Sequence, residues 1–228
     1  MHRQGAVELV GVYDTDPAQA RSIAEKQGTA ALGSVEAAAA AADALSIVTP
    51  TVTHHDLAKP LLEQGKHLLV EKPMTDNAGQ AADLVRLARQ HDCVLQVGHI
   101  ERFNPVFNYL QQAAREPRFI ESHRLSPFPA RSMDIGVVLD LMIHDLDIVL
   151  AFVRSPVEHV DAAGVRVLSA SEDIANARLR FANGCVANLT VSRVSPESLR
   201  KIRVFSGGSS GGRRFGQRCR SRGRPYHY

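Results

Sequence analysis

The sequence predicts an α/β fold: a doubly wound parallel sheet followed by an α+β domain with a mostly antiparallel sheet. In residues 1–100, short apolar runs alternate with helical patterns, which is typical of βαβ units. In residues 101–206, strand-like runs follow one another with no helix between them, which favours antiparallel pairing. Residues 207–228 form a third region, rich in Gly and Arg, that we expect to be disordered.

The first region is expected to begin with a strand at residues 7–14. Asp16 and Pro17 then start a helix, with Asp as the N-cap and Pro at the first helical position. The further elements are a helix from Ser34 to about 42, a strand at 44–48, a helix at 54–63, a strand at 67–70, a helix at 77–90 and a strand at 94–97.

The second region is expected to carry two helices and a run of strands. The helices are predicted near residues 104–115 and 135–153, and the strands near 118–123, 157–168, 174–181, 185–193 and 200–205.

Composition excludes several classes of protein. The hydrophobic fraction of 44% and the charged fraction of 22% are ordinary for a globular protein. The most apolar segment, 135–153, is interrupted by acids and a His, so no membrane span is expected. The three Cys are scattered without a CxxC pair, which indicates neither a disulfide framework nor a metal site. The start of the chain lacks a secretory pattern, and a cytoplasmic location is expected.

The basic net charge belongs to the end of the chain. Residues 207–228 contain six Arg and no acid, so the formal net charge of +3 leaves 3 − 6 = −3 for the rest. A Gly/Arg arm could contact nucleic acid. Because the composition changes abruptly within a strand pattern, we favour a non-native end over a nucleic-acid-binding arm.

Glu71, Lys72 and Pro73 directly follow the apolar run 67–70. In an open α/β sheet, the carboxyl edge reached here is where ligands bind. The Lys ammonium could polarise a hydroxyl there, and Pro sets a rigid turn, with a cis bond as one option. A Lys after a strand is more often simply solvated, so this motif gains weight only from its context.

Asp14 ends the first expected strand. In a dinucleotide-binding fold, an acid at the end of the second strand hydrogen-bonds the adenosine ribose, which favours NAD over NADP. Asp14 fits this role, so the strand before it would be the second strand of that fold. Asp14 could also simply cap a turn. The Gly-rich phosphate loop would stand about 20 residues upstream, outside the sequence. We therefore expect the first strand of the sheet to be missing, and the chain as written to be poorly stable and to bind dinucleotide weakly.

Asp140 and His144 are four residues apart, so a helix places them on one face. A carboxylate beside a His orients the ring and stabilises its charged form, which is what a general base needs. A buried His that is satisfied by an Asp for structural reasons would look the same.

The ordered motifs resemble those of the Gfo/Idh/MocA family of nicotinamide-dependent sugar and polyol dehydrogenases. The matching pieces are 10–14, 47–50 with His54, 71–73, 97–99 with 102–105, and Asp140 with His144 and Asp147. The resemblance implies that Lys72, Asp140 and His144 form the active site. It also implies a set of cofactor-binding residues: Asp14, Thr49, Pro50, His54, Glu71 and Pro73.

The resemblance further implies NAD as cofactor and a sugar as substrate. Residues 98–105, 129–132 and 139–145 look like the branch that acts on UDP-N-acetylglucosamine for lipopolysaccharide. In that branch, Arg124 and Arg131 would pair with the diphosphate, while Arg102 and Asn104 would lie near the substrate. Met142 stands where many members have Gly, which would narrow the pocket.

Two other functions stay open: an inositol or simple polyol dehydrogenase of the same family, and a catalytically silent fragment. An open sheet with one uncovered face also favours a homodimer or homotetramer.

Overall fold

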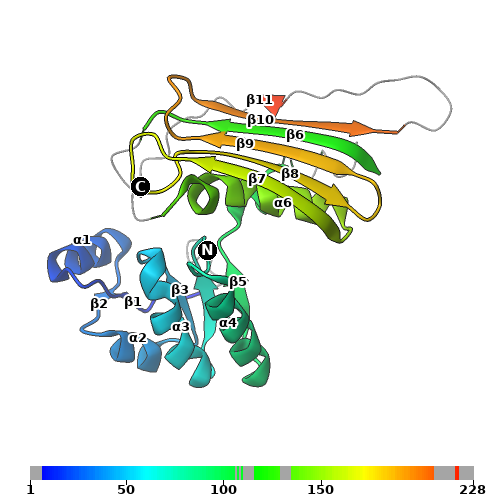
Figure 1. Cartoon of the computed structure of the whole chain (residues 1–228). Helices are drawn as coiled ribbons and strands as arrows, with labels where there is room; N and C mark the ends of the chain where they lie inside the picture. Colours follow the sequence, from blue (N-terminus) through cyan, green and yellow to red (C-terminus); the bar gives the residue numbers. More distant parts are fainter. Residues whose placement is uncertain are drawn as a thin grey trace. The chain divides into compact units, whose positions relative to one another are not determined.

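The computed structural model describes residues 7–105, 107, 109, 116–128, 135–207 and, for the backbone, 219–220. The chain divides into two compact units, Met1–Gly98 and His99–Tyr228. Figure 1 shows the helices and strands of each unit.

The first unit alternates strands and helices. Its elements are β1 (Gly11–Val12), α1 (Pro17–Gln27), β2 (Ala30–Ala31), α2 (Val35–Ala41), β3 (Ala44–Ile47), η2 (Thr51–Thr53), α3 (His54–Glu63), β4 (His67–Val70), α4 (Ala78–Gln90) and β5 (Leu95–Val97). The predicted helix starts at Asp16 and Ser34 are confirmed, because each side chain accepts a hydrogen bond from a backbone N–H of the first turn. Asn77 caps α4 in the same way.

All strand pairs of the first unit are parallel, as the βαβ pattern predicts. They form two separate sheets, β1–β2 and β3–β4–β5. The predicted strand at 7–14 is reduced to Gly11–Val12, and β2 was not predicted because a two-residue Ala strand leaves no alternation to detect. The doubly wound class is confirmed, and the loop expected upstream stays a prediction.

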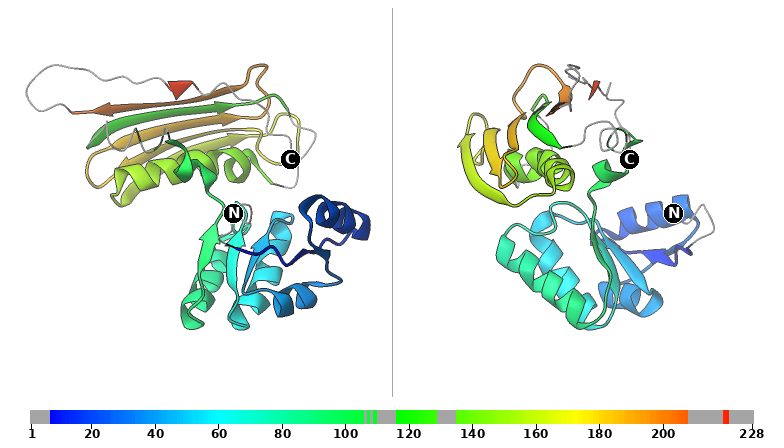
Figure 2. Two further views of the ribbon diagram at one scale, coloured as in Figure 1. Left: turned by 180° about the vertical axis from the view of Figure 1, so that it is seen from behind. Right: turned by 90° about the vertical axis from the view of Figure 1, so that its right-hand side faces the viewer.

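Helices α3 and α4 pack against the β3–β4–β5 sheet, and the two helices also contact each other (Figure 2). The core between them includes Ala58, Leu62, Val70 and Leu84, each of which is fully buried. Since each fully buried Leu or Val side chain contributes about 1.5–3 kcal/mol, this core stabilises the unit that presents the carboxyl ends of β3 and β4.

The second unit contains one large sheet and a helix. Its elements are η3 (Ile100–Phe103), β6 (Pro117–Leu125), η4 (Val138–Met142), α6 (Ile143–Val153), β7 (Val157–Val165), β8 (Ile174–Phe181), β9 (Val186–Ser192), β10 (Leu199–Ser206) and β11 (Cys219–Arg220). The strand order is β11–β10–β6–β9–β8–β7, and every pair is antiparallel except β6 with β9.

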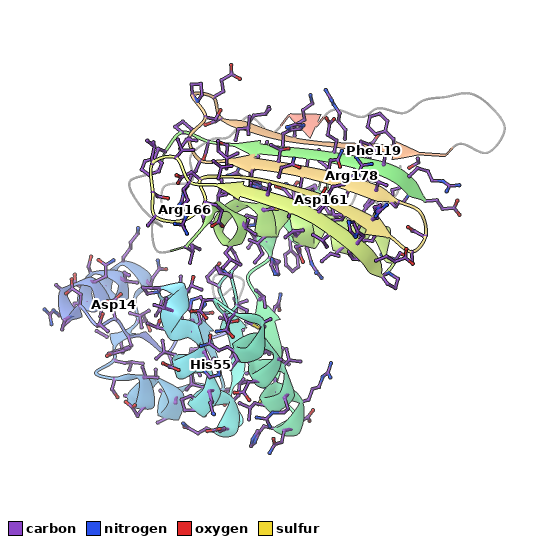
Figure 3. The ribbon with its side chains drawn as sticks, in the orientation of Figure 1. Asp14, His55, Phe119, Asp161, Arg166 and Arg178 are labelled. Atoms are coloured by element: carbon purple, nitrogen blue, oxygen red, sulfur yellow. The ribbon has the colours of Figure 1, made fainter. Side chains whose placement is uncertain are left out.

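Helix α6 covers one face of this sheet (Figure 1). Strand β8 alternates buried and exposed residues, and its buried side chains meet Val149 and Phe152 of the helix in the core. The opposite face carries Phe119, Asp161 and Arg178 (Figure 3). The sheet is thus covered by a helix on one face only.

The predicted helix at 135–153 begins differently from the expectation. Its first turn, Val138–Met142, is a π-helix that continues into α6. Most of the helix predicted near 104–115 and of the disorder predicted for 207–228 lies outside the described residues. Within that tail, Cys219–Arg220 pairs with β10.

None of the helices in the described part of the chain is long and apolar enough to cross a membrane.

Candidate active site

The carboxyl edge of the β3–β4–β5 sheet brings two of the predicted motifs together. Ile47 at the end of β3 is paired with Val70 at the end of β4. Because the strands are parallel, Thr49 and Pro50 follow one strand at the same edge where Glu71–Pro73 follows the other. This is the edge at which open α/β sheets bind ligands.

His54 ties these two strand ends to each other. Its Nδ1 lies 3.0 Å from the carbonyl oxygen of Pro73, and its Nε2 lies 2.8 Å from that of Thr49. The side chain is only 1% exposed. The Lys72–Pro73 bond, just before the Pro73 carbonyl that His54 reaches, is cis. The geometry favours a role for His54 in holding the turn around Lys72 rather than in touching a cofactor.

Glu71 packs over the end of the neighbouring strand. Its Oε2 accepts a hydrogen bond from the backbone N–H of Lys72 at 3.2 Å. A Cβ atom on Gly98 would stand 2.8 Å from that oxygen, so a side chain at the position after β5 would displace the Glu71 carboxylate. The Glu71 carboxylate thus fixes the backbone on which Lys72 stands.

Asp14 lies just beyond β1 and is exposed (Figure 3). One carboxylate oxygen accepts a hydrogen bond from the N–H of Asp16 at 2.9 Å. Asp14 therefore caps the turn before α1, which is one of the two roles considered for it. A ribose hydroxyl could still be accepted by a carboxylate in this exposed position.

In the second unit, the predicted pair Asp140 and His144 stands on one continuous helix. Asp140 lies in the π-helical turn η4, and His144 lies in the first turn of α6, both half-buried. π-Helical turns occur often at functional sites. Met142 is only 2% exposed and belongs to the core under the sheet, so the expectation that it narrows a pocket is wrong.

Two ion pairs hold the part of α6 that directly follows His144. Arg124 of β6 donates from Nε and Nη2 to Asp145 at 2.9 and 3.0 Å, and both side chains are buried. Arg102 of η3 donates from Nε to both oxygens of Asp147 at 3.0 and 2.8 Å. Fork-shaped pairs of this kind fix orientation as well as position.

The groups around Arg124 favour its charged form. Burial alone would lower the pKa of Arg124, but the hydrogen bonds and charge of Asp145, with the charges of Glu101 and Asp140, raise it. The pKa of Arg102 is likewise raised by its hydrogen bonds to Asp147. Asp140 therefore lies within electrostatic reach of the Arg124 guanidinium.

The four predicted substrate residues have different surroundings. Arg124 is neither a solvated loop residue nor open to a ligand, because it is 6% exposed and paired with Asp145. Arg102 is half-exposed and also paired. Asn104 donates to Glu101 at 3.2 Å. Arg131 lies outside the described residues.

Sequence reasoning missed a buried network beside the site helix, by which we mean η4 and α6 together, the helix that carries Asp140 and His144. Arg193 and Asp173 are both fully buried, and Nε of Arg193 donates to Asp173 Oδ1 at 2.8 Å. Arg193 also donates from Nη1 to the carbonyl of Ile135 at 2.9 Å, just before η4. The sequence offered one signal for the burial of Arg193: a charged residue stands at the end of a strand-like apolar run.

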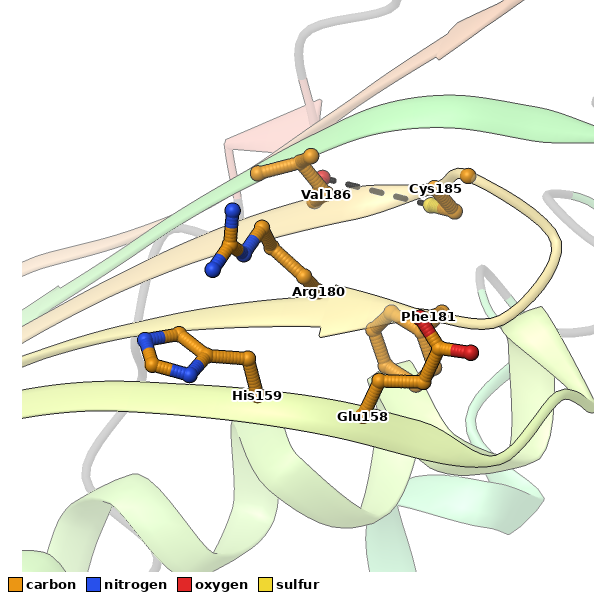
Figure 4. Close-up of a pocket in the computed structure, with 7 residues that line it drawn as sticks. Glu158, His159, Arg180, Phe181, Cys185 and Val186 are labelled. Carbon is orange, nitrogen blue, oxygen red and sulfur yellow. Dashed lines mark hydrogen bonds between the residues drawn. The ribbon is translucent and has the colours of Figure 1, made fainter.

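A hollow on the sheet lies away from these residues. It has a volume of about 510 Å³ and is lined by residues of β7, β8, β9 and the β8–β9 turn. Figure 4 shows Glu158, His159, Arg180, Phe181, Cys185 and Val186 around it. None of the predicted site residues lines it, and we assign it no function. In the described part of the chain, no three His, Cys, Asp or Glu side chains are grouped to hold a metal.

Comparison with known proteins agrees with this architecture. The family described as an oxidoreductase family with an NAD-binding Rossmann fold matches residues 1–99. The GFO/IDH/MocA C-terminal domain matches residues 111–211.

UDP-N-acetylglucosamine 3-dehydrogenase of Acidithiobacillus ferrooxidans is 42% identical over 199 residues, which cover 87% of this chain and 64% of that protein. Its solved structure has a TM-score of 0.84 at 41% identity, covering 89% of this chain and 67% of that chain. scyllo-Inositol 2-dehydrogenase of Bacillus subtilis is 26% identical, covering 68% of this chain and 49% of the relative. The chain thus spans less than two thirds of the length of these two curated relatives.

The parallel unit and the helix-covered sheet unit define a two-unit protein of the Rossmann class. The chain belongs to the Gfo/Idh/MocA family of oxidoreductases.

Proposed function

We propose that this chain belongs to an NAD-dependent dehydrogenase that transfers a hydride from a sugar hydroxyl carbon to the nicotinamide, with UDP-N-acetylglucosamine as the substrate. The observation that carries the proposal is the 42% identity to a UDP-N-acetylglucosamine 3-dehydrogenase. It is supported by Lys72 at a strand's carboxyl edge in one unit and Asp140 with His144 on one helix in the other.

The carboxyl edge of the first unit fits a dinucleotide. Val48 follows β3 and is 72% exposed, which leaves an apolar surface where a cofactor ring could lie. Thr49 and Pro50 come next, and Glu71 and Pro73 follow the neighbouring strand. The exposed Asp14 would accept from a ribose hydroxyl and repel a 2′-phosphate, which favours NAD over NADP.

In the proposed mechanism, the residues of the chain handle the proton and the charge. When bound, NAD⁺ accepts the hydride from the carbon that carries the hydroxyl. His144 takes the hydroxyl proton as general base, and Asp140 holds the ring tautomer. The Lys72 ammonium donates to the same oxygen and stabilises its developing negative charge, so a carbonyl forms as the carbon loses its hydride.

Recognition of the sugar nucleotide is assigned to residues of the second unit. Arg102 and Asn104 are proposed to lie near the substrate, and Arg131 to pair with the diphosphate. For Arg124, the pairing with Asp145 favours an indirect role, in which it positions the helix that carries His144.

Inositol oxidation is the second candidate, because relatives include scyllo-inositol 2-dehydrogenase of Bacillus subtilis and inositol 2-dehydrogenase of Rhizobium meliloti. Both substrates offer a secondary ring hydroxyl to the same general base. Only the nucleotide sugar carries a diphosphate. An Arg that pairs with the diphosphate, such as the role proposed for Arg131, would therefore favour the nucleotide sugar over a free inositol.

Self-association is proposed through the sheet face that bears Phe119, Asp161 and Arg178. The Phe119 and Phe205 rings lie 6.0 Å apart between centroids on neighbouring strands, and Phe205 is 40% exposed. Light scattering on the chain and on Phe205→Glu tests a homodimer or homotetramer. A monomeric wild type would reject it. The cytoplasmic location stays a prediction.

The substrate assignment is tested by following NADH absorbance at millimolar NAD⁺ with UDP-N-acetylglucosamine, UDP-glucose, myo-inositol and scyllo-inositol in parallel. We expect the highest kcat/KM with UDP-N-acetylglucosamine. Faster turnover of a free inositol would select the second candidate. Bound NAD without turnover of any substrate would favour the silent fragment.

A further inference from the structure

Glu172 contacts the start of the site helix with both its backbone and its side chain. Its carbonyl oxygen accepts from the N–H of Val137 at 2.9 Å, and its Oε1 accepts from the N–H of Val138 at 3.3 Å. The first N–H groups of a helix have no partner within the helix itself. A carboxylate at this end also interacts favourably with the helix dipole.

Two glycines leave the space that the Glu172 side chain occupies. A Cβ atom on Gly136 would stand 1.9 Å from Glu172 Oε1, and one on Gly164 would stand 3.2 Å from its Cβ. Gly136 directly precedes Val137, and its carbonyl accepts from the N–H of Asp140 at 3.0 Å. The backbone turn that carries Asp140 is thus built against the Glu172 carboxylate.

The residue next to Glu172 is anchored independently. Asp173 is fully buried, and its Oδ2 accepts from the N–H groups of Val167, Leu168 and Ser169 at 2.8, 2.7 and 2.9 Å. Its Oδ1 accepts from Arg193. Since Arg193 also donates to the carbonyl of Ile135, one buried guanidinium contacts both the loop and the segment that leads into the helix.

We propose that Glu172 is a positioning residue for Asp140 and His144. It holds the first N–H groups of the helix from a loop that is anchored by Asp173 and Arg193, and it thereby sets where the proton-accepting pair stands. This role rests on the proposed function, because it acts through the general base of that reaction.

Three substitutions separate the contributions of Glu172. Glu172→Ala removes the side-chain acceptor, whereas Glu172→Gln keeps an oxygen that can accept from Val138. Gly136→Ala leaves the charge in place but forces the carboxylate away from the helix start. The exposed Glu197 supplies the control, Glu197→Ala. Thermal unfolding of each variant establishes that it folds.

Amide hydrogen exchange followed by NMR tests the contact without turnover. We expect exchange at Val138 to quicken by about tenfold to a hundredfold in Glu172→Ala and Gly136→Ala, the range for loss of a bond to a charged group. Exchange in Glu172→Gln should fall between wild type and Glu172→Ala, because a neutral oxygen accepts more weakly than a carboxylate. Exchange in Glu197→Ala should stay near wild type. Unchanged exchange at Val138 in Glu172→Ala would overturn the proposal.

Kinetics test the consequence for the site. We expect kcat to fall by about tenfold in Glu172→Ala and Gly136→Ala, with KM for NAD⁺ unchanged and recovery in Glu172→Gln. A change in KM for NAD⁺ alone, or a Gln variant as slow as the Ala variant, would overturn the positioning role. A wild type without turnover would reject the proposed function, and the exchange pattern would still decide whether Glu172 holds the turn.

Discussion

The guanidinium of Arg124 and the carboxylate of Asp145 form a buried, doubly hydrogen-bonded ion pair that joins strand β6 to the first turn of α6. Asp145 directly follows His144 in the chain. The pair therefore fixes the turn on which the proposed general base stands, and it occupies two donors of an Arg that could otherwise bind a phosphate.

Breaking this pair from one side should be costly. Asp145→Leu leaves the Arg124 cation buried without its partner, so we expect the free energy of unfolding to drop by about 3–5 kcal/mol. The double variant Arg124→Met with Asp145→Leu should lose clearly less than the sum of the single changes. Urea unfolding measures both.

The pair of Arg86 with Asp83 supplies the control, because the Arg86 side chain is 60% exposed and Arg86→Ala should change stability little. Equal losses at the exposed and the buried site would contradict the structural role of Arg124.

His54 is expected to stabilise the turn around Lys72. In His54→Ala, the carbonyls of Thr49 and Pro73 lose the ring whose nitrogens lie within hydrogen-bond distance of them, and we expect a loss of about 1–3 kcal/mol in unfolding free energy. Thermal denaturation of His54→Ala beside the less buried His91→Ala checks this. A similar, small shift in both would show that the two contacts contribute nothing.

Asp173 should make the protein sensitive to acid. Burial alone would raise the pKa of Asp173, but hydrogen bonds from Ser169, Arg193 and the N–H groups of Leu168 and Val167 hold it well below its usual range. An unfolded Asp has a pKa of about 3.9, so its stabilising contribution is complete above that pH and is lost as the pH falls below it.

Urea midpoints measured from pH 6 down to pH 3 test this dependence. Asp173→Asn should be less stable at pH 6 and should lose less further stability on acidification than wild type does. The exposed Glu8→Gln serves as control. Parallel curves for wild type and Asp173→Asn would be the contrary result.

The open edges of β1 and β3 predict that an added strand would stabilise the first unit. Among the described residues, β1 pairs only with β2 and β3 only with β4. A parallel strand with a Gly-rich loop, fused ahead of residue 7, should raise Tm and strengthen NAD binding. Calorimetry of the fused and unfused chains measures both. No gain in either would refute the prediction.

The sequence predicted well what depends on local pattern. Helix caps at Asp16 and Ser34 are set by residues within one turn, so they were readable directly. The order of strands and helices was enough to predict parallel strands, and parallel strands place Thr49 and Lys72 at the same edge of the sheet.

Long-range pairings could not be predicted in this way. Arg124 is 21 residues from Asp145, and Arg102 is 45 from Asp147, so no spacing rule relates them. The parallel pairing of β6 with β9 and the π-helical start of the site helix likewise depend on packing between distant segments. Glu172 was overlooked because its role depends on the space above Gly136.

The most direct test of the central claim compares kcat for wild type, His144→Ala and Lys72→Ala at saturating NAD⁺ and UDP-N-acetylglucosamine. General acid–base catalysis contributes about 10²–10⁴-fold, so each variant should be slower by at least about 10². His159→Ala, an exposed His on strand β7, should keep wild-type turnover. Near-wild-type kcat in His144→Ala or in Lys72→Ala would contradict the account.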